Sequence, residues 1–376
     1  MRKNILIFGH TDATQFIDIS NQYTRIFAKE FFEVTVVYLA SAPDKLNTKK
    51  HLSDHVIYLG EKNKSTRGLK IAAIQKMLYL YRQKKFDLVI CHRYQPMYVM
   101  LCVAQFCQIP AAIFIMHELN VFKKIRRKIS VAFLWQKNMI LAGVSNAVRD
   151  NMRRHIWRIP AEKIITLYNA IDHERMEPTL LNQKEACEQL HLSKDDFIFG
   201  TIGRLAKAKD HLTLIKAFAA IELLCPKAKL VILGEGEERT ILKQTIESLN
   251  LTHKVIMPGF IPDAFRLMKA LDIFILSSIQ EAFGRVLLEA MLAKIPIIAN
   301  HIHGIPEVVG QTGILIEAKN PIILAEKMLE LYNMNHTERM QQGEQGYNRA
   351  IEVFSINRFS DTFWQLPLIK QCEALL

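Results

Sequence analysis

Short apolar runs alternate with amphipathic, helix-forming stretches along almost the whole chain of 376 residues. Apolar runs bounded by glycine or small polar residues are typical of buried β-strands. Strands that alternate with helices form parallel sheets covered by helices, and we therefore predict an α/β fold of doubly wound sheets. The predicted strands are NILIFG, VTVVYLA, HVIYLG, FDLVICH, AAIFIMH and MILAGVS, then FIFGTIGRL, AKLVILGEG, KVIMPGF, DIFILSS, IPIIAN and GILIEA.

The length of the chain predicts two domains, because a single hydrophobic core rarely grows beyond about 250–300 residues. A polar stretch at residues 173–195 separates the two series of predicted strands and is a candidate passage between domains. The first predicted domain is residues 1–172, and the second begins at residue 173. Two open sheets that face each other would leave a cleft between the carboxyl ends of their strands, where ligands bind.

The composition is that of a soluble globular protein, with 50% hydrophobic and 23% charged residues. The most apolar region, YVMLCVAQFCQIPAAIFIM, is interrupted by Gln105, Gln108 and Pro110, which disfavours a membrane span. The apolar stretch near the N-terminus is too short for a signal peptide, and the six cysteines show no C-x-x-C spacing. We therefore expect a cytoplasmic protein with reduced cysteines.

Charge is distributed unevenly: residues 1–175 carry a formal net charge of +15 and the remainder carries −3. This asymmetry predicts an anionic partner for the first half, either a membrane leaflet, an acidic glycan or a nucleic acid. The densest basic run, residues 121–138, also contains Phe122, Phe133 and Trp135, a pattern typical of an interfacial helix. A solvated helix with its aromatic residues in the core is the alternative. Nucleic acid is not expected, because no recognition module is found.

The loop GTIGRLAKAKDH follows the first strand of the second series. Gly203 permits a tight turn there, and Arg204 and Lys209 place two cations in the same strand-to-helix loop. Arginine binds oxyanions through two hydrogen bonds and lysine supplies a point charge. Next to backbone N–H groups at a helix start, this pair predicts a diphosphate site; two surface cations without a ligand are the alternative.

The stretch EAFGRVLLEAML predicts a second ligand-binding loop. Glu281 is expected at the carboxyl end of the strand DIFILSS, and Glu289 about two turns into the helix that follows. Carboxylates accept hydrogen bonds from sugar hydroxyls, whereas the N–H groups of residues 284–286 at the helix start can hold a phosphate. A nucleoside diphosphate sugar satisfies all these groups, with its ribose at one glutamate, its sugar at the other and its diphosphate between them.

In the first half, polar residues follow two further predicted strands. His117 and Glu118 come after AAIFIM, and His92 and Arg93 end FDLVICH, so all four are expected at the carboxyl edge of the sheet. A single histidine at such a place is either structural or functional. The stretch LVILGEGEER lacks the third glycine of the dinucleotide fingerprint, and no metal-ligand cluster or D-x-D pair is found.

The segments GRLAKAK, LVILGEGEER, MPGF, EAFGRVLLEAMLAKIPIIAN and HGIPEVV and, more loosely, MHE and LYNAID together resemble the retaining glycosyltransferases of family 4. The spacing of seven residues between Glu281 and Glu289 is the most specific part of the resemblance. It implies the GT-B fold, two Rossmann-like doubly wound domains that face each other across a cleft. Residues 1–172 with a returning C-terminal helix, 355–376, would bind the acceptor, and residues 173–354 the donor.

The resemblance also implies a role for individual residues. Arg204 and Lys209 would hold the donor diphosphate and Glu289 the ribose, whereas His117 and Glu281 would contact the transferred sugar as catalytic residues. Further donor-side positions are Gly203, Gly259, Ile261, Phe283, Gly284, Arg285 and Val286, and acceptor-side positions are Gly9, His92, Arg93 and Glu118. The chain departs from the family in its first loop, FGHTDATQF, where Gly9 is the only glycine.

The implied function is transfer of a hexose from a nucleotide-sugar, such as a UDP-sugar, with retention of configuration. The acceptor would be a glycan or glycolipid in the synthesis of bacterial envelope polysaccharide or lipopolysaccharide. No metal or cofactor is implied, because Arg204 and Lys209 would neutralise the leaving group. The basic first domain favours an anionic acceptor and peripheral contact with the anionic inner membrane. The alternatives are transfer to a soluble acceptor, and nucleotide-sugar binding without turnover.

Overall fold

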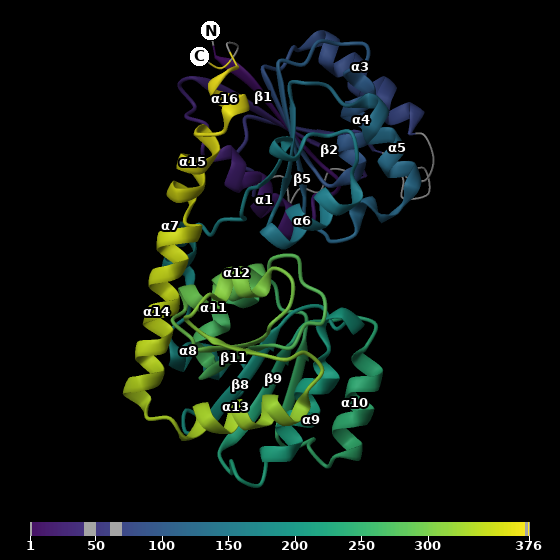
Figure 1. Ribbon diagram of the computed structural model, residues 1–376. Coiled ribbons are helices and arrows are strands. Elements are labelled where there is room, and N and C mark those ends of the chain that lie inside the picture. The colour runs from purple at the N-terminus through teal and green to yellow at the C-terminus, as the bar shows by residue number, and fades with distance from the viewer. Residues whose placement is uncertain (1, 41–49, 61–69, 373–374, 376) are drawn as a thin grey trace. The chain divides into compact units, whose positions relative to one another are not determined.

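The computed structural model describes residues 2–40, 50–60, 70–372 and 375 (Figure 1). Contacts within the chain divide it into two compact units. Unit 1 consists of Met1–Ala170 together with Ile356–Leu376, and unit 2 consists of Ile171–Ser355. Each unit is built around one parallel sheet, which confirms the predicted α/β fold class.

The sheet of unit 1 has seven parallel strands in the order β3-β2-β1-β4-β5-β6-β7. They are β1 (Lys3–Gly9), β2 (Phe32–Tyr38), β3 (His55–Tyr58), β4 (Leu88–His92), β5 (Ala111–Met116), β6 (Met139–Gly143) and β7 (Ile164–Thr166). Every residue of β4, β5 and β6 is buried, as expected for central strands that are covered on both faces. Strand β7, which has three residues, was not predicted.

Helices of unit 1 come from both ends of the chain. They are α1 (Thr14–Thr24), α3 (Ile71–Gln83), α4 (Tyr94–Val103), η1 (Val121–Lys123), α5 (Ile125–Leu134), α6 (Asn146–His155), η2 (Ala161–Lys163), α15 (Ile356–Trp364) and α16 (Pro367–Lys370). The C-terminal α15 packs on α1 through aromatic side chains: the rings of Phe359 and Phe363 lie 4.9 Å and 6.3 Å from that of Tyr23. Edge-to-face pairs at these distances are favourable beyond the area they bury.

The sheet of unit 2 has six parallel strands in the order β10-β9-β8-β11-β12-β13. They are β8 (Phe197–Ile202), β9 (Ala228–Leu233), β10 (Val255–Gly259), β11 (Ile273–Leu276), β12 (Ile297–Asn300) and β13 (Ile314–Ile316). The helices are α7 (His173–Met176), η3 (Glu177–Thr179), α8 (Gln183–Gln189), η4 (Lys207–Lys209), α9 (His211–Ile221), α10 (Arg239–Ser248), η5 (Ala264–Ala270), α11 (Arg285–Leu292), α12 (Ile305–Val309), α13 (Pro321–Asn333) and α14 (His336–Phe354).

Residues 173–195 do not form an extended passage between the two units. They contain α7, η3 and α8, and α8 packs against η5 within unit 2. A capping box fixes the start of α8: the Asn182 side chain accepts from the Glu185 amide, and the Glu185 carboxylate accepts from the Asn182 amide. The polar composition of this stretch therefore reflects short surface helices.

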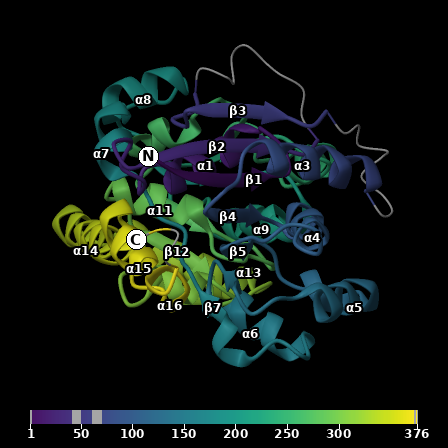
Figure 2. The ribbon, with the colours of Figure 1, turned by 90° about the horizontal axis from the view of Figure 1, so that it is seen from above.

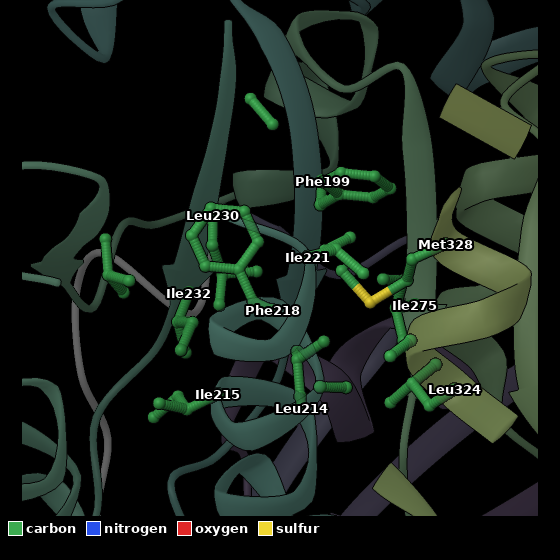
Figure 3. Close-up of a cluster of buried hydrophobic side chains, with 14 of the residues drawn as sticks. Phe199, Leu214, Ile215, Phe218, Ile221, Leu230, Ile232, Ile275, Leu324 and Met328 are labelled. Carbon is green, nitrogen blue, oxygen red and sulfur yellow. The ribbon is translucent and has the colours of Figure 1, made fainter. Parts of the chain in front are cut away.

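The core of unit 2 anchors the strands that carry its loops. Figure 3 shows Phe199 and Leu230 from the sheet meeting Phe218 from α9, with Leu324 and Met328 contributed by α13. All five side chains are fully buried, so α9 and α13 are held firmly on the sheet. Rigid strands fix the positions from which the loops at their ends begin.

Each sheet contains one switch point, a place between two neighbouring strands at which the direction of winding reverses. In unit 1 it lies between β1 and β4, and the order β3-β2-β1-β4-β5 can be followed in Figure 2. In unit 2 it lies between β8 and β11. The loops after two such strands run to opposite sides of the sheet, which leaves space at the carboxyl ends for a ligand.

Candidate active site

Two loops of unit 2 meet at its switch point. The first, residues 203–210, follows β8 and the second, residues 277–284, follows β11. The Lys209 Nζ atom forms an ion pair with Glu281 Oε2 at 2.5 Å, and both side chains are largely buried. The Ile279 amide donates to the Ala208 carbonyl at 2.9 Å. The two loops predicted to hold a diphosphate and a sugar are thus joined by side chains and by backbone.

Two residues that the sequence analysis did not single out brace these loops. Ser277 Oγ donates to the Lys209 carbonyl at 2.9 Å. Asn300 Nδ2, at the end of β12, donates to the carbonyls of Ser277 at 2.7 Å and Ser278 at 3.0 Å. All three residues are buried, so these bonds are shielded from water and hold the loops in one arrangement. A polar residue that ends the apolar run IPIIA was the available signal for Asn300.

The loop after β9 supports the loop after β8 by direct contact of the two backbones. A Cβ atom at Gly234 would lie 1.9 Å from the Gly203 carbonyl oxygen, and one at Gly236 would lie 2.2 Å from that of Leu205. The Leu205 amide donates to the Glu235 carbonyl at 2.8 Å. Only glycine allows so close an approach, which explains LGEG without a dinucleotide at this loop.

Arg204 and Lys209 differ in how firmly they are held. The Lys209 side chain passes over Gly203, with its Cε atom 3.9 Å from where a Cβ of that residue would be. Arg204 is 72% exposed and lies 3.8 Å from Glu237 Oε1 in the loop after β9. An exposed ion pair of this kind contributes only about 0–1 kcal/mol. The Arg204 guanidinium is therefore available to bind another anion.

The turn after Glu281 sets the start of α11. Gly284 has a φ of 91°, and α11 begins at Arg285, so Glu289 lies little more than one turn into the helix and not two as predicted. The helix itself lies within the stretch that was expected to form it, and only the depth of Glu289 in that helix was overestimated. Phe283 is buried with its ring 5.6 Å from that of Phe354, whereas Arg285, Val286 and Glu289 are half-buried.

The predicted contacts for a nucleotide base lie at the end of β10. The Gly259 carbonyl accepts from the Gly234 amide at 2.9 Å, so this loop is braced against the loop after β9. Ile261 is half-buried and follows the exposed Phe260. Because β10 lies two places from β8 in the sheet, these residues occupy the same carboxyl edge as Arg204 and Lys209.

In unit 1 the structure places two histidines in contact. His92 ends β4 and is 2% exposed, and its Nδ1 atom lies 3.0 Å from Nε2 of His117, which follows β5. Burial, with a smaller effect of Arg93, lowers the pKa of His92 to about 3. His92 is therefore neutral at physiological pH. It lies at the carboxyl edge of the sheet, as expected, and its side chain contacts His117 from within the unit.

A pocket of about 120 Å³ lies at the same edge of unit 1. Its lining is His10, Arg93, Tyr94, Gln95, Met116, His117, Glu118, Val121 and Arg127. Arg93 Nη2 and Glu118 Oε1 lie 3.1 Å apart. Gly9 is not part of the lining; it is buried with the Tyr38 ring about 3.0 Å from where its Cβ would be. Its neighbour His10 lines the pocket instead, and burial lowers the pKa of His10.

His10 and Gln95 were not among the predicted site residues. The available signal for His10 was its place directly after the first strand, at the switch point of the sheet. In the part of the chain that the structure describes, no helix is long and apolar enough to cross a membrane. Among those same residues, no group of three or more His, Cys, Asp or Glu side chains could hold a metal ion.

These observations define a class: two parallel α/β units of the Rossmann type, each with polar side chains at its switch point. Family models agree. The model for glycosyl transferases group 1 matches residues 182–349, and that for glycosyltransferase family 4 matches residues 22–175. The chain belongs to these glycosyltransferases, and its fold is GT-B.

Individual relatives support the same assignment. An N-acetylgalactosaminyltransferase of Campylobacter jejuni, whose name gives a diphospho-undecaprenol acceptor, is 33% identical over 55% of this chain and 54% of that protein. The chain thus matches about half the length of this relative. The capsular polysaccharide glycosyltransferase CapM of Staphylococcus aureus is 24% identical over 96% of both proteins. The structure of Anabaena Alr3699/HepE in complex with UDP superposes with a TM-score of 0.78 at 19% identity, covering 96% of this chain and 98% of that one.

Proposed function

We propose that the chain transfers a hexose from a nucleotide-sugar, favouring UDP as the nucleotide, to a glycan or glycolipid of the bacterial envelope. The observation that carries this proposal is the Lys209–Glu281 pair across the two loops at the switch point of unit 2. It puts a cation suited to a diphosphate beside a carboxylate suited to sugar hydroxyls. Support for the nucleotide comes from the UDP bound in the Anabaena structure.

On the donor side, each residue has one task in this proposal. Lys209 has three N–H donors and can bind Glu281 and a phosphate oxygen together. Arg204 exchanges its weak contact with Glu237 for the diphosphate. The N–H groups at the start of α11 hold a phosphate, because the first turn of a helix lacks intrahelical acceptors. Glu289 binds the ribose and residues 259–261 the base.

The transfer step follows from these contacts. The acceptor oxygen attacks the anomeric carbon from the face on which the diphosphate leaves. The new C–O bond forms as the bond to the phosphate oxygen breaks, and the acceptor proton passes to that departing oxygen. Arg204 and Lys209 stabilise the charge that develops on the diphosphate, so the proposal needs no metal and no cofactor. Glu281 orients the sugar through its hydroxyls.

His117 positions the transferred sugar in this proposal, and His92 sets its tautomer. If neutral His92 donates from Nδ1, its other nitrogen is left as a buried lone pair with no partner. The opposite arrangement would leave a buried N–H without a partner, which costs more. His92 is therefore the donor, and His117 accepts at Nε2 and carries its own proton on Nδ1.

The acceptor class rests on the pocket of unit 1. Arg93 and Arg127 line it together with a single carboxylate, Glu118. This balance of charge favours an anionic acceptor such as a lipid-linked diphosphate or an acidic glycan. The Campylobacter relative, whose name gives a diphospho-undecaprenol acceptor, supports the lipid-linked form.

A transfer assay with labelled UDP-, GDP- and ADP-hexoses, an envelope lipid extract and a chelator tests the proposal. We expect label from one donor in the lipid fraction. Arg204→Ala should lower the rate roughly 100- to 1,000-fold, the usual cost of a lost transition-state contact. Lys207→Ala, an exposed lysine in the same loop, is the matched control and should keep the parent rate. Label released only as free sugar, or donor binding without turnover, would contradict the proposal.

A further inference from the structure

Helix α5 presents a stripe of apolar side chains to solvent. Ile125, Ile129 and Phe133 are 60%, 43% and 69% exposed, and their spacing of four residues puts them on one face. Figure 1 shows α5 beside α4 at the periphery of unit 1. The opposite face of α5 is the one that packs inward, where Val131 is fully buried. The stripe is therefore additional to the apolar face that the fold requires.

Two further aromatic residues adjoin the C-terminal end of this stripe. Gln105 Nε2 donates to the Leu134 carbonyl at 3.0 Å, which brings Phe106, 69% exposed, to the end of α5. The Arg158 guanidinium lies 5.2 Å from the centre of the Phe133 ring, and its neighbour Trp157 is 49% exposed. The apolar patch thus comprises Phe106, Ile125, Ile129, Phe133 and Trp157. Exposed patches drawn from several elements mark interaction surfaces.

Cations surround the apolar patch. Lys123, Lys124 and Arg126 are exposed beside the stripe and Lys128 is half-exposed. Exposed arginines of α6 and of the loop after it add to them. No acidic residue occurs in the sequence between Glu118 and Asp150. Positive charge around protruding apolar side chains is complementary to anionic lipid head groups above an apolar layer.

Not every residue of the basic run belongs to this surface. Arg127 turns inward, with its guanidinium 4.5 Å from the centre of the Tyr94 ring and Nη1 donating to the Val121 carbonyl at 2.9 Å. Phe122 is buried, and Trp135 is half-buried against Phe114. Of the three aromatic residues that the sequence assigned to an interfacial helix, only Phe133 is exposed on this surface. The 3₁₀ turn η1 interrupts the helical phase before α5.

We infer that the apolar patch and its cations form a docking surface for an anionic lipid bilayer. A nucleic acid would use the cations but would leave the aliphatic side chains of α5 without a partner. The inference extends the proposed function and rests on it only for the link between this surface and a lipid-linked acceptor. Val121 and Arg127 line the 120 Å³ pocket, so the segment that meets the bilayer also forms a wall of the pocket that would take a lipid-linked acceptor.

Cosedimentation of the full chain with vesicles tests this inference, without any nucleotide-sugar. We expect binding to vesicles of equal parts phosphatidylcholine and phosphatidylglycerol, weaker binding at high salt, and little binding to phosphatidylcholine alone. The triple variant Lys124→Gln, Arg126→Gln, Lys128→Gln should bind about 100-fold more weakly, since each cation near such a surface contributes roughly fivefold. The double variant Ile129→Ser, Phe133→Ser should lose roughly tenfold or more.

Matched controls come from exposed residues of unit 2. The triple variant Lys194→Gln, Lys227→Gln, Lys243→Gln and the double variant Leu223→Ser, Leu224→Ser should bind vesicles as the parent does. Parent-like vesicle binding by the α5 variants would overturn the inference, as would RNA binding without vesicle binding. The assay contains no donor, so its failure is distinct from failure of sugar transfer. All substituted residues are solvent-accessible, and matching circular dichroism spectra would establish that the variants are folded.

Discussion

Arg93 has a backbone conformation that residues other than glycine rarely adopt. Its φ of 75° and ψ of 166° lie in a region that costs a non-glycine residue about 1–3 kcal/mol. Its amide donates to the Ile115 carbonyl at 2.8 Å, and its guanidinium lies 4.4 Å from the centre of the Phe16 ring and contacts Glu118. A strained arginine that lines a pocket is better explained by function than by stability.

Two substitutions separate strain from function at this position. Arg93→Gly removes the side-chain contacts but relieves the strain, whereas Arg93→Ala removes the contacts and keeps the strain. We expect the glycine variant to be more stable than the alanine variant by about 1–2 kcal/mol in urea unfolding, after allowance for the greater freedom of unfolded glycine. Both variants should lose most sugar transfer. An alanine variant as stable as the glycine one, or full transfer by either, would refute this account.

The contact between Lys209 and Glu281 could be predicted from the pattern of strands in the sequence. Lys209 and Glu281 each follow a strand, and β8 and β11 are neighbours at the switch point, so their proximity needed only the fold. The contact between His92 and His117 and the conformation of Arg93 depend on side-chain rotation and on φ, which no spacing encodes. His10 was missed for a simpler reason: a single histidine after a strand resembles many structural ones.

At the scale of elements, adjacent strands β4 and β5 deliver two histidines into contact at the edge of the sheet. Tyr23 from α1 covers His92, with ring centres 4.8 Å apart in an edge-to-face arrangement. Burial is the main cause of the lowered pKa of His92, and the Tyr23 ring is one of the groups that bury it. A strand end, a neighbouring strand and a helix thus together hold one imidazole neutral.

This burial makes the stability of unit 1 depend on pH. The pKa of His92 is about 3 in the folded state and about 6.5 in an unfolded chain, so acid favours the unfolded chain. The contribution of neutral His92 to the free energy of unfolding is fully present above pH 6.5. It falls by up to about 1.4 kcal/mol per pH unit as the pH drops toward 3. Urea unfolding at pH 7 and pH 5 should show a smaller fall for His92→Asn and His92→Leu than for the parent.

Activity distinguishes positioning from packing in the same two variants. The Asn side chain retains an N–H donor for His117 Nε2, whereas Leu does not. His92→Asn should therefore keep more sugar transfer than His92→Leu. Equal activity of the two would argue that His92 only fills space. The buried His211 of unit 2, with a pKa lowered to about 4, should give that unit an acid sensitivity of the same sign.

Elements also show where the sequence pattern was insufficient. The alternation of apolar runs and amphipathic stretches located twelve of the thirteen strands that the structure describes, and the exception was β7. The exposed face of α5 was not predictable in detail, because the turn η1 resets the helical phase at residues 121–124. The helix α11 lies where its helix-forming residues indicated, and only the number of turns before Glu289 was overestimated.

The whole molecule divides its chemistry between two units of unequal charge. The more basic part of the chain contains the pocket lined by His117 and Arg93 and the docking surface on α5. The near-neutral second part contains the Lys209–Glu281 pair and the loops braced around it. This division fits a unit 1 that meets an anionic acceptor and a unit 2 that binds a donor carrying its own diphosphate. Family membership gives the class of reaction, and the two sets of residues give each unit its proposed task.

Nucleotide release from UDP-, GDP- and ADP-sugars, measured with a chelator and without acceptor, tests the central claim most directly. Slow release from one donor, lost in Arg204→Ala and Glu289→Ala but kept in Lys207→Ala, is the result we predict. It would identify the donor and place its diphosphate and ribose on the named residues. Failure of every donor to bind or to be hydrolysed, or release that persists in both variants, would contradict the assignment of unit 2 as the donor site.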